Sequence, residues 1–345
     1  MTSLERVATI LQHKEADRVP VYPLINSISR NYQNINYPTW SMDIDKCAQS
    51  IISATDDIGV DVICSLIDLS VEAADFGQKI IYPEHDAAHP ALDNRLLPDI
   101  GSLKTLQPID PTRTPRMSDH IRLCQTLMNE RGTTHPVVAF VFGPLGILSM
   151  LRGQSEIFMD MIDDPSAVHD ALSAITETLV IYCKELMKTG VHAVMFDTLF
   201  ASQSILSKEM WDEFEGPYIE RLSRLVHDNN TMVMIHNCGN GIYFDAQIKR
   251  MEPEAISFLF PPDDCADFSE TKAKYGDQTT LIGYITPSWL LSAEEEEIRK
   301  ECREEMDTCK KDGGFILATG CEYPSGLPSD KAKIIVDEAL RSGQY

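Results

Sequence analysis

Short runs of β-branched and other apolar residues alternate with helical patterns along the whole chain. Strands are predicted at residues 19–25, 60–67, 137–142, 191–196, 232–236, 254–260, 280–285 and 315–319. Helix start signals lie between them: Asp164 and Pro165 precede a periodic run to Lys188, and Ser207 precedes another that reaches His227. Nearly continuous apolar strands separated by helices indicate a buried parallel sheet, and eight such units close a barrel. We therefore predict an α/β fold with a single (β/α)8 TIM-barrel domain over residues 1–345, with a doubly wound open sheet as the alternative.

One segment interrupts this alternation. Residues 77–117 are rich in proline, histidine and aspartate, which predicts an insertion of loops with a hairpin after the second strand unit. We expect the insertion to cover part of the barrel mouth. It contains Glu84, His85, Asp86 and His89, which are metal-ligand residue types, but their proline-flanked setting favours a solvated loop.

The charge balance narrows the range of partners. The formal net charge of -23 repels phosphate backbones and anionic lipid headgroups, so we expect neither nucleic acid nor membrane as a partner. The start of the chain lacks the uninterrupted apolar core of a secretory signal, and no run is long enough to span a membrane. Nine cysteines without framework spacing suit a reducing compartment, so a cytoplasmic location is expected. Cys302 and Cys309, seven residues apart, are predicted to face the core of a charged helix.

Three residues with metal-binding side chains follow two of the predicted strands. His236 and Cys238 end the fifth strand, and the period of two places both side chains on one face. Cys321 follows the eighth strand, again at the carboxyl end, where barrel enzymes carry their active sites. One imidazole and two thiolates favour zinc, and three protein ligands leave a fourth position for a substrate. The alternative is a buried histidine with two inert thiols.

Other strand ends bring polar side chains to the same mouth. We predict that Asp197 and Tyr284 have catalytic roles and that Asn26, Asp68 and Glu72 bind the substrate. Asp197 could orient a zinc ligand or contact the substrate, although a capping hydrogen bond would also account for it. Asp68 and Glu72 could instead cap the helix that follows them.

Several common catalytic motifs are missing. The turn GPLGILSMLRG at 143–153 is compatible with a tight bend facing a substrate, but it lacks the spacing of a phosphate-binding loop. No GxGxxG, GxxxxGK[ST] or GxSxG pattern follows a predicted strand. Dinucleotide chemistry, nucleoside-triphosphate chemistry and serine-hydrolase chemistry therefore have no support.

The motifs in this order resemble the uroporphyrinogen decarboxylase superfamily along nearly the whole chain. They are RVATILQHKEADRVPV, GPLGILSMLRG, MFDTLFAS, IHNCGNG and ILATGCEYP. The resemblance implies a (β/α)8 barrel. It also implies one of two activities, metal-free decarboxylation of a porphyrinogen or zinc-dependent methyl transfer with a corrinoid protein.

The methyltransferase branch is the sharper match. The enzymes that methylate coenzyme M carry H-x-C followed much later by C, and His236, Cys238 and Cys321 match that motif. The resemblance therefore implies a Zn2+ cofactor, with a small thiol or thioether as the methyl acceptor or donor. No DxHxxG signature of a cobalamin-binding domain occurs, so the corrinoid (cobalamin) is expected on a partner protein.

This sequence departs from the branch at two places. Phe258, Leu259 and Phe260 occupy a stretch where an acidic residue is common, and Tyr284 and Thr286 replace an asparagine and an acidic residue. These departures imply an unusual substrate pocket.

Two alternatives to the methyltransferase remain. The decarboxylases hold their polycarboxylate substrate with an arginine-rich segment after the first strand, where this chain has the lone Arg30. That difference disfavours a decarboxylase. A non-enzymatic barrel that binds a corrinoid or a structural zinc is the third interpretation, favoured if the zinc has four protein ligands.

Overall fold

Eight parallel strands form one curved sheet in the computed structural model, which describes residues 1–345. The strands are β1 (Val21–Tyr22), β2 (Ile63–Cys64), β5 (Val137–Phe142), β6 (Ala193–Asp197), β7 (Met232–Asn237), β8 (Ala255–Phe258), β9 (Thr280–Ile285) and β10 (Phe315–Thr319). Their order in the sheet is β1-β10-β9-β8-β7-β6-β5-β2, so neighbours in sequence are neighbours in space. All eight coincide with predicted strands, and the (β/α)8 prediction is confirmed.

The first and last strands of this order meet through Asp61, just before β2. Its backbone N–H donates to the carbonyl oxygen of Val21 at 2.8 Å, and its carboxylate accepts the N–H of Val21 at 2.8 Å. A side chain thus supplies one of the hydrogen bonds that join β1 to the β2 segment. β1 itself has only two residues, because Pro20 and Pro23 on either side have no N–H to donate.

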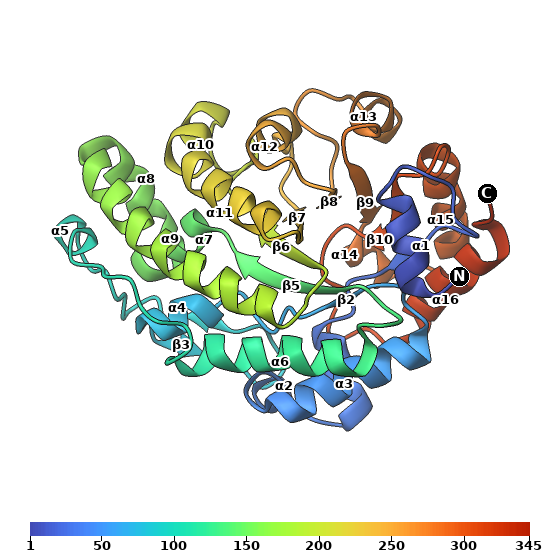
Figure 1. The fold of residues 1–345 in the computed structure, drawn as a ribbon, viewed down its shortest axis with the longest axis horizontal. Coiled ribbons are helices and arrows are strands. Elements are labelled where there is room, and N and C mark those ends of the chain that lie inside the picture. Colours follow the sequence, from blue (N-terminus) through green and yellow to red (C-terminus); the bar gives the residue numbers. More distant parts are fainter.

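Helices surround the sheet (Figure 1). They are α1 (Ser3–Ile10), the 3-10 helix η1 (Ser27–Gln33), α2 (Tyr37–Met42), α3 (Ile44–Ile58), α4 (Val71–Phe76), α5 (Ile100–Leu103), α6 (Pro115–Arg131), α7 (Pro144–Arg152), α8 (Gln154–Asp163), α9 (Pro165–Lys188), α10 (Lys208–Phe214), α11 (Gly216–Asp228), α12 (Phe244–Met251), α13 (Phe268–Tyr275), α14 (Pro287–Leu290), α15 (Glu295–Cys309) and α16 (Asp330–Ser342). Asp164 caps α9 through the N–H of Ala167, as its start signal predicted. No helix combines the length and apolarity needed to cross a membrane.

The helical run predicted after Ser207 is two helices. α10 ends at Phe214 and α11 begins at Gly216, with Pro217 in its first turn. Proline has no N–H to continue the hydrogen bonds of α10, but its fixed φ suits the start of a new helix. Cys302 and Cys309 lie buried on α15, as predicted.

The predicted insertion is present between β2 and β5. It contains a two-stranded antiparallel hairpin, β3 (Ile80–Ile81) and β4 (His89–Pro90), followed by α5. Residues 87–90 of the hairpin line the cavity at the barrel mouth. The insertion therefore covers part of the mouth.

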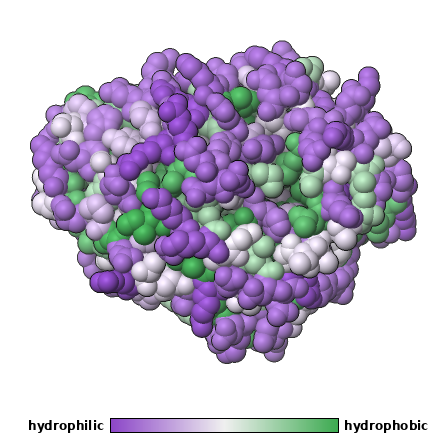
Figure 2. Space-filling model, viewed as in Figure 1, coloured by the Kyte–Doolittle hydropathy of each residue, from purple (hydrophilic) through white to green (hydrophobic).

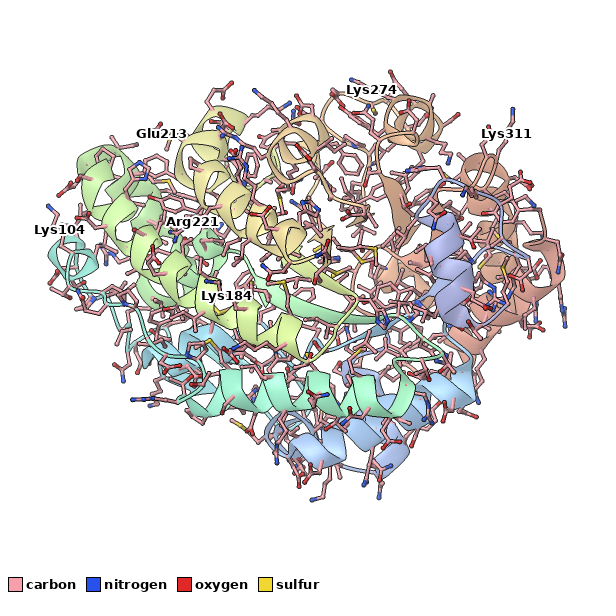
Figure 3. All side chains as sticks on the ribbon, in the orientation of Figure 1. Lys104, Lys184, Glu213, Arg221, Lys274 and Lys311 are labelled. Carbon is pink, nitrogen blue, oxygen red and sulfur yellow. The ribbon has the colours of Figure 1, made fainter.

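Buried hydrophobic residues form two separate clusters. The larger lies between the sheet and the helices, and the smaller, of sixteen residues, fills the barrel interior. Val7 and Ile10 of α1 belong to the interior cluster, so α1 closes the amino-terminal end of the barrel. Charged side chains cover the outer helices, as Lys184 and Arg221 illustrate (Figure 3), and hydrophilic residues cover most of the face in view (Figure 2).

Candidate metal centre

Three polar residues lie level with one another on neighbouring strands. The register of the sheet pairs Asp197 of β6 with His236 of β7, and His236 with Ser257 of β8. All three are buried and belong to the last residues of their strands. Parallel strands all end at the same edge, so this row lies at the carboxyl end of the barrel.

The three predicted metal ligands converge at this end. The candidate ligand atoms of His236, Cys238 and Cys321 all lie within 4.8 Å of one another. The histidine is buried, and both cysteines are half-buried and free of disulfides. An ion bound about 2.0–2.3 Å from each nitrogen or sulfur atom would fit between ligands at such spacing.

A hydrogen-bonded turn after β7 positions Cys238. Asn237 donates from its side-chain amide to the carbonyl oxygen of Thr198 at 2.7 Å, and its side-chain oxygen accepts the N–H of Gly239 at 2.9 Å. Cys238 lies between these two anchored residues. The turn therefore fixes the backbone on both sides of Cys238.

A glycine is required beside Cys321. A Cβ atom on Gly320 would lie 2.6 Å from the Cα atom of Leu259, which is closer than real Cβ atoms approach a backbone. Glycine lets the chain leave β10 against the end of β8. That close approach brings Cys321 to the other two ligands.

Ser257 orients the imidazole. Its hydroxyl lies 3.0 Å from Nδ1 of His236, in hydrogen-bonding distance. With Nδ1 engaged, Nε2 is the ring nitrogen that remains for a metal. A hydrogen bond to the other ring nitrogen is the usual means of fixing a metal-binding histidine.

The pKa values of the two thiols depend on each other. A hydrogen bond from Cys238 lowers the pKa of Cys321 well below its usual value, against the effect of burial and with help from His236. The same hydrogen bond, together with burial, raises the pKa of Cys238. Burial acts to lower the pKa of His236, but the hydrogen bond and charge of Cys321 outweigh it and raise that pKa. One thiolate is therefore already favoured, as metal binding requires.

The ligand cluster opens into a cavity of about 230 Å³. Thirteen of its twenty lining residues are hydrophobic, so it suits a small molecule with an apolar body. Among the predicted site residues, the cavity brings together the ligands with Asn26, Asp68 and Asp197.

Three polar atoms of lining residues are buried without a hydrogen-bond partner. They are Nδ2 of Asn26, Oδ1 of Asp197 and the hydroxyl of Tyr22. Burial raises the pKa of Asp197 to about 6, in spite of the opposing charge of His236. Unpartnered buried groups of this kind are costly in a purely structural role and are common where a ligand binds.

Asp68 and Glu72 differ from Asp197. The Asp68 carboxylate is bound by Arg116 at 2.6 Å and by the hydroxyls of Ser41 and Ser70, so its hydrogen-bonding capacity is largely used within the protein. Glu72 lies outside the cavity, accepts the N–H of Phe142 at 3.2 Å, and has its pKa raised to about 8 by burial. Both carboxylates are therefore engaged within the protein, and Asp68 also accepts the N–H of Ser70, the residue before α4.

Tyr284 is not brought to the site. Its ring stacks on Phe268 with centroids 3.4 Å apart, within the cluster between the sheet and the helices. Phe258 packs in the same layer, against Phe244 and Tyr284. The catalytic role predicted for Tyr284 therefore finds no support in its position, and Phe258 does not occupy the pocket.

The predicted loop cluster separates into two parts. Glu84, His85 and Asp86 are exposed and do not line the cavity, which agrees with a solvated loop. His89 does line it, from the hairpin. Only this member of the cluster lies close to the candidate site.

Glu322 is a lining residue that the sequence reasoning missed. It follows Cys321 directly and accepts the N–H of Ser27 at 2.8 Å, and burial raises its pKa. Its position directly after Cys321, at the end of a predicted strand, could have identified it from the sequence. Tyr22 and Ser257 were also missed, because tyrosine and serine inside strands usually indicate packing.

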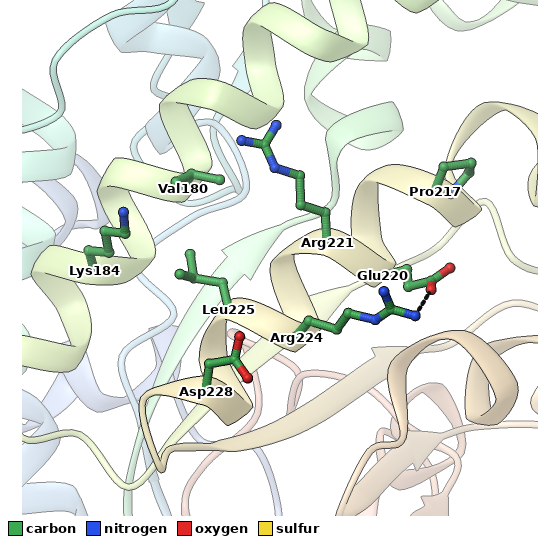
Figure 4. Close-up of a pocket in the computed structure, with 8 residues that line it drawn as sticks. All are labelled: Val180, Lys184, Pro217, Glu220, Arg221, Arg224, Leu225 and Asp228. Carbon is green, nitrogen blue, oxygen red and sulfur yellow. Dashed lines mark hydrogen bonds and ion pairs between the residues drawn. The ribbon is translucent and has the colours of Figure 1, made fainter.

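A larger hollow lies far from this chemistry. It measures about 540 Å³ and lies between α9 and α11 on the outer surface (Figure 4). Its charged residues pair with acidic neighbours: Arg224 with Glu220, and Arg221 with Glu177 at 2.6 Å. It holds no cluster of metal-ligating side chains, so the smaller cavity is the candidate site.

Comparison with known proteins identifies the family of this chain and solved structures with the same fold. The family model described as Uroporphyrinogen decarboxylase (URO-D) matches residues 2–341. Curated uroporphyrinogen decarboxylases are distant in sequence. The one from Flavobacterium johnsoniae is 29% identical and aligned over 66% of this chain and 64% of its own length. The one from Anaeromyxobacter dehalogenans is 20% identical over 96% and 97%.

Two solved structures share the fold. A methyltransferase from Methanosarcina mazei aligns over 99% of both chains with a TM-score of 0.84 and 18% identity. A B12-independent methionine synthase from Shewanella sp. W3-18-1 aligns over 85% of both chains with a TM-score of 0.57 and 14% identity. At these identities the likeness is one of fold.

Proposed function

The chain belongs to the uroporphyrinogen decarboxylase family, and from this premise we propose that it is a zinc-dependent methyltransferase. It would move a methyl group between a corrinoid on a partner protein and the sulfur of a small thiol or thioether. The observation that carries the proposal is the convergence of His236, Cys238 and Cys321 on one cavity at the carboxyl end of the barrel. The matching fold of a Methanosarcina methyltransferase over 99% of both chains supports it.

The donor set fits zinc. One nitrogen and two sulfur ligands are typical of catalytic zinc sites with an open fourth position, and the hydrogen bond to Ser257 leaves Nε2 of His236 for the ion. When bound, zinc would lower the pKa of a substrate thiol and hold its sulfur at the open position. Asp197, on the strand beside His236, has an unpartnered carboxylate oxygen to bind or orient the substrate.

The same cavity argues against decarboxylation of a tetrapyrrole. A substrate with a carboxylate on every arm needs several cations, yet no lysine or arginine lines the cavity. Arg30, the lone arginine of the segment after the first strand, donates to the carbonyl oxygens of Ser27 and Ser325 at 2.9 and 3.3 Å. A volume of about 230 Å³ is also small for four linked rings.

Metal analysis with a transfer assay tests the proposal. We expect about one zinc per chain in the purified protein and transfer of methyl between methylcobalamin and a thiol. Cys321→Ser should lose both, because the serine hydroxyl is a poor zinc ligand. Cys265→Ser, at a half-buried cysteine outside the cavity, is the matched control and should keep both. Wild-type protein that binds no zinc and decarboxylates a porphyrinogen would contradict the proposal.

A further inference from the structure

The cavity carries carboxylates but no permanently cationic side chain. Of its twenty lining residues, Asp68, Asp197 and Glu322 are acidic and none is lysine or arginine. The two lining histidines are the metal ligand His236 and the exposed His89 of the hairpin. The formal charge of the whole chain, -23, has the same sign as the lining.

Only one of the three carboxylates is paired with a cation. Asp68 forms an ion pair with Arg116 at 2.6 Å. Neither Asp197 nor Glu322 lies within ion-pair distance of any basic group; Glu322 accepts a backbone N–H, and Oδ1 of Asp197 has no partner. Arg30 acts on Glu322 through its charge, but its guanidinium is bound to two carbonyl oxygens and does not line the cavity.

The remaining walls suit an apolar body with few polar atoms. Leu24, Leu66, Ile67, Phe140 and Met150 are among the thirteen hydrophobic lining residues. An anionic group in this setting would lose its hydration and face two unpaired carboxylates without gaining a cation, which is strongly unfavourable. A hydroxyl or ammonium group could instead donate to Oδ1 of Asp197 or to Glu322.

We propose that the substrate of this cavity is a small thiol or thioether without negative charge, either neutral or cationic at the end remote from sulfur. The sulfur chemistry rests on the proposed function. The charge selectivity rests on the lining of the cavity alone. Asp197 and Glu322 disfavour a sulfonate or carboxylate on the substrate.

Three thiols of similar length test the selectivity in protein loaded with cobalt(II) in place of zinc. Mercaptoethanol is neutral, cysteamine is cationic and mercaptoethanesulfonate is anionic. Binding is measured on the cobalt(II)-substituted protein from the thiolate-to-metal absorption band, with affinities compared per thiolate. We expect the anionic thiol to bind weaker than the neutral one by about tenfold or more, and the cationic thiol to bind at least as well as the neutral one.

A second experiment needs neither zinc nor methyl transfer. Metal-free protein is alkylated with neutral iodoacetamide or anionic iodoacetate, and labelling is followed at each cysteine by peptide mass mapping. We expect iodoacetamide to be favoured at Cys321, relative to the half-buried Cys265 outside the cavity, by about tenfold or more. Cys265, whose thiol donates to Asp264 at 3.5 Å, reports the effect of negative charge outside the cavity. Glu322→Gln and Asp197→Asn should each reduce the preference at Cys321 and leave Cys265 unchanged.

The outcomes separate the two proposals. The charge selectivity is wrong, although the methyltransferase stands, if the sulfonate thiol binds as tightly as mercaptoethanol. It is also wrong if the preference for iodoacetamide over iodoacetate is the same at Cys321 as at Cys265. If no thiol reaches the metal while the alkylation preference holds, the sulfur chemistry of the proposed function is wrong. The preference at Cys321 would then still support a cavity that excludes anions.

Discussion

Two buried aspartates at opposite ends of the barrel have opposite surroundings. Asp61, at the amino-terminal end, accepts hydrogen bonds from Arg6 and Arg18 at 2.7 Å each, from Ser3 and from the backbone of Val21. At the carboxyl end, Asp197 has a buried oxygen with no partner. Their exposed fractions, 0% and 5%, are almost the same.

Burial alone therefore does not distinguish a structural carboxylate from a functional one. The carboxylate of Asp61 compensates two arginines and joins β1 to the β2 segment, so folding uses all of its hydrogen-bonding capacity. Asp197 keeps capacity that folding does not use, and it lies beside a candidate metal ligand. Three of the nine buried side-chain atoms without a hydrogen-bond partner belong to residues that line the candidate cavity, and Asp197 is one of these residues.

The largest expected effect on stability is that of Asp61→Asn. The side chains of Arg6 and Arg18, which are 9% and 11% exposed, would lose their shared counter-charge. Removing one partner of a buried ion pair typically costs about 3–5 kcal/mol. Urea unfolding should show this loss in the free energy of unfolding. The fraction that remains folded should still bind zinc. A variant as stable as wild type would show that the hydrogen bonds and ion pairs of Asp61 contribute little to stability.

Glu72→Gln should change how stability depends on pH. Burial raises the pKa of Glu72 to about 8 from an ordinary value of 4.5, so between these pH values the folded state holds a proton that the unfolded state releases. Wild-type stability therefore falls as pH rises through that window, by up to about 1.4 kcal/mol per pH unit, and the penalty is complete above about pH 8.

Glutamine resembles the protonated acid and does not titrate. The difference in unfolding free energy between variant and wild type should therefore grow from pH 5 to pH 8 in the variant's favour. Urea unfolding at a series of pH values measures it. A constant difference across this range would mean that Glu72 stays ionised in the folded protein.

The smallest expected change in stability is that of Asp197→Asn, and it sharpens the contrast with Asp61. No cation depends on Asp197, so the free energy of unfolding should stay within about 0.5 kcal/mol of wild type or rise. Methyl transfer should nevertheless fall by about 10- to 100-fold, because the substrate would lose the carboxylate that binds or orients it. Equal losses of stability and activity would assign Asp197 a structural role.

Much of the fold followed from periodicity. The eight apolar runs are long enough to be recognised, and the start signal at Asp164 located α9 to the residue. Gly216 and Pro217 were a signal for the break between α10 and α11. The break was not predicted, because the helical pattern continues on both sides of these two residues. Period two also placed His236 and Cys238 on one face, and Cys321 at the same edge of the sheet.

For the other predicted site residues, the sequence did not show which of them reach the cavity with an unpaired side chain. Asn26, Asp68 and Asp197 follow predicted strands and Tyr284 lies near the end of one, so the four residues looked equivalent. In the structure, Asp68 is bound by Arg116, forty-eight positions further along the chain, and Tyr284 packs outward on Phe268. Glu322, which shares the cavity with Asp197, was not recognised.

By itself the sequence determined the barrel, the end of it that carries chemistry, and three residues able to share one metal ion. Alternation along a strand decides which face a side chain takes, and parallel strands bring their carboxyl ends together. Only the tertiary structure decided which acidic side chains are neutralised and which remain free in the cavity. That outcome depends on partners from distant segments, such as Arg116 for Asp68 and the arginines for Asp61, which no local pattern specifies.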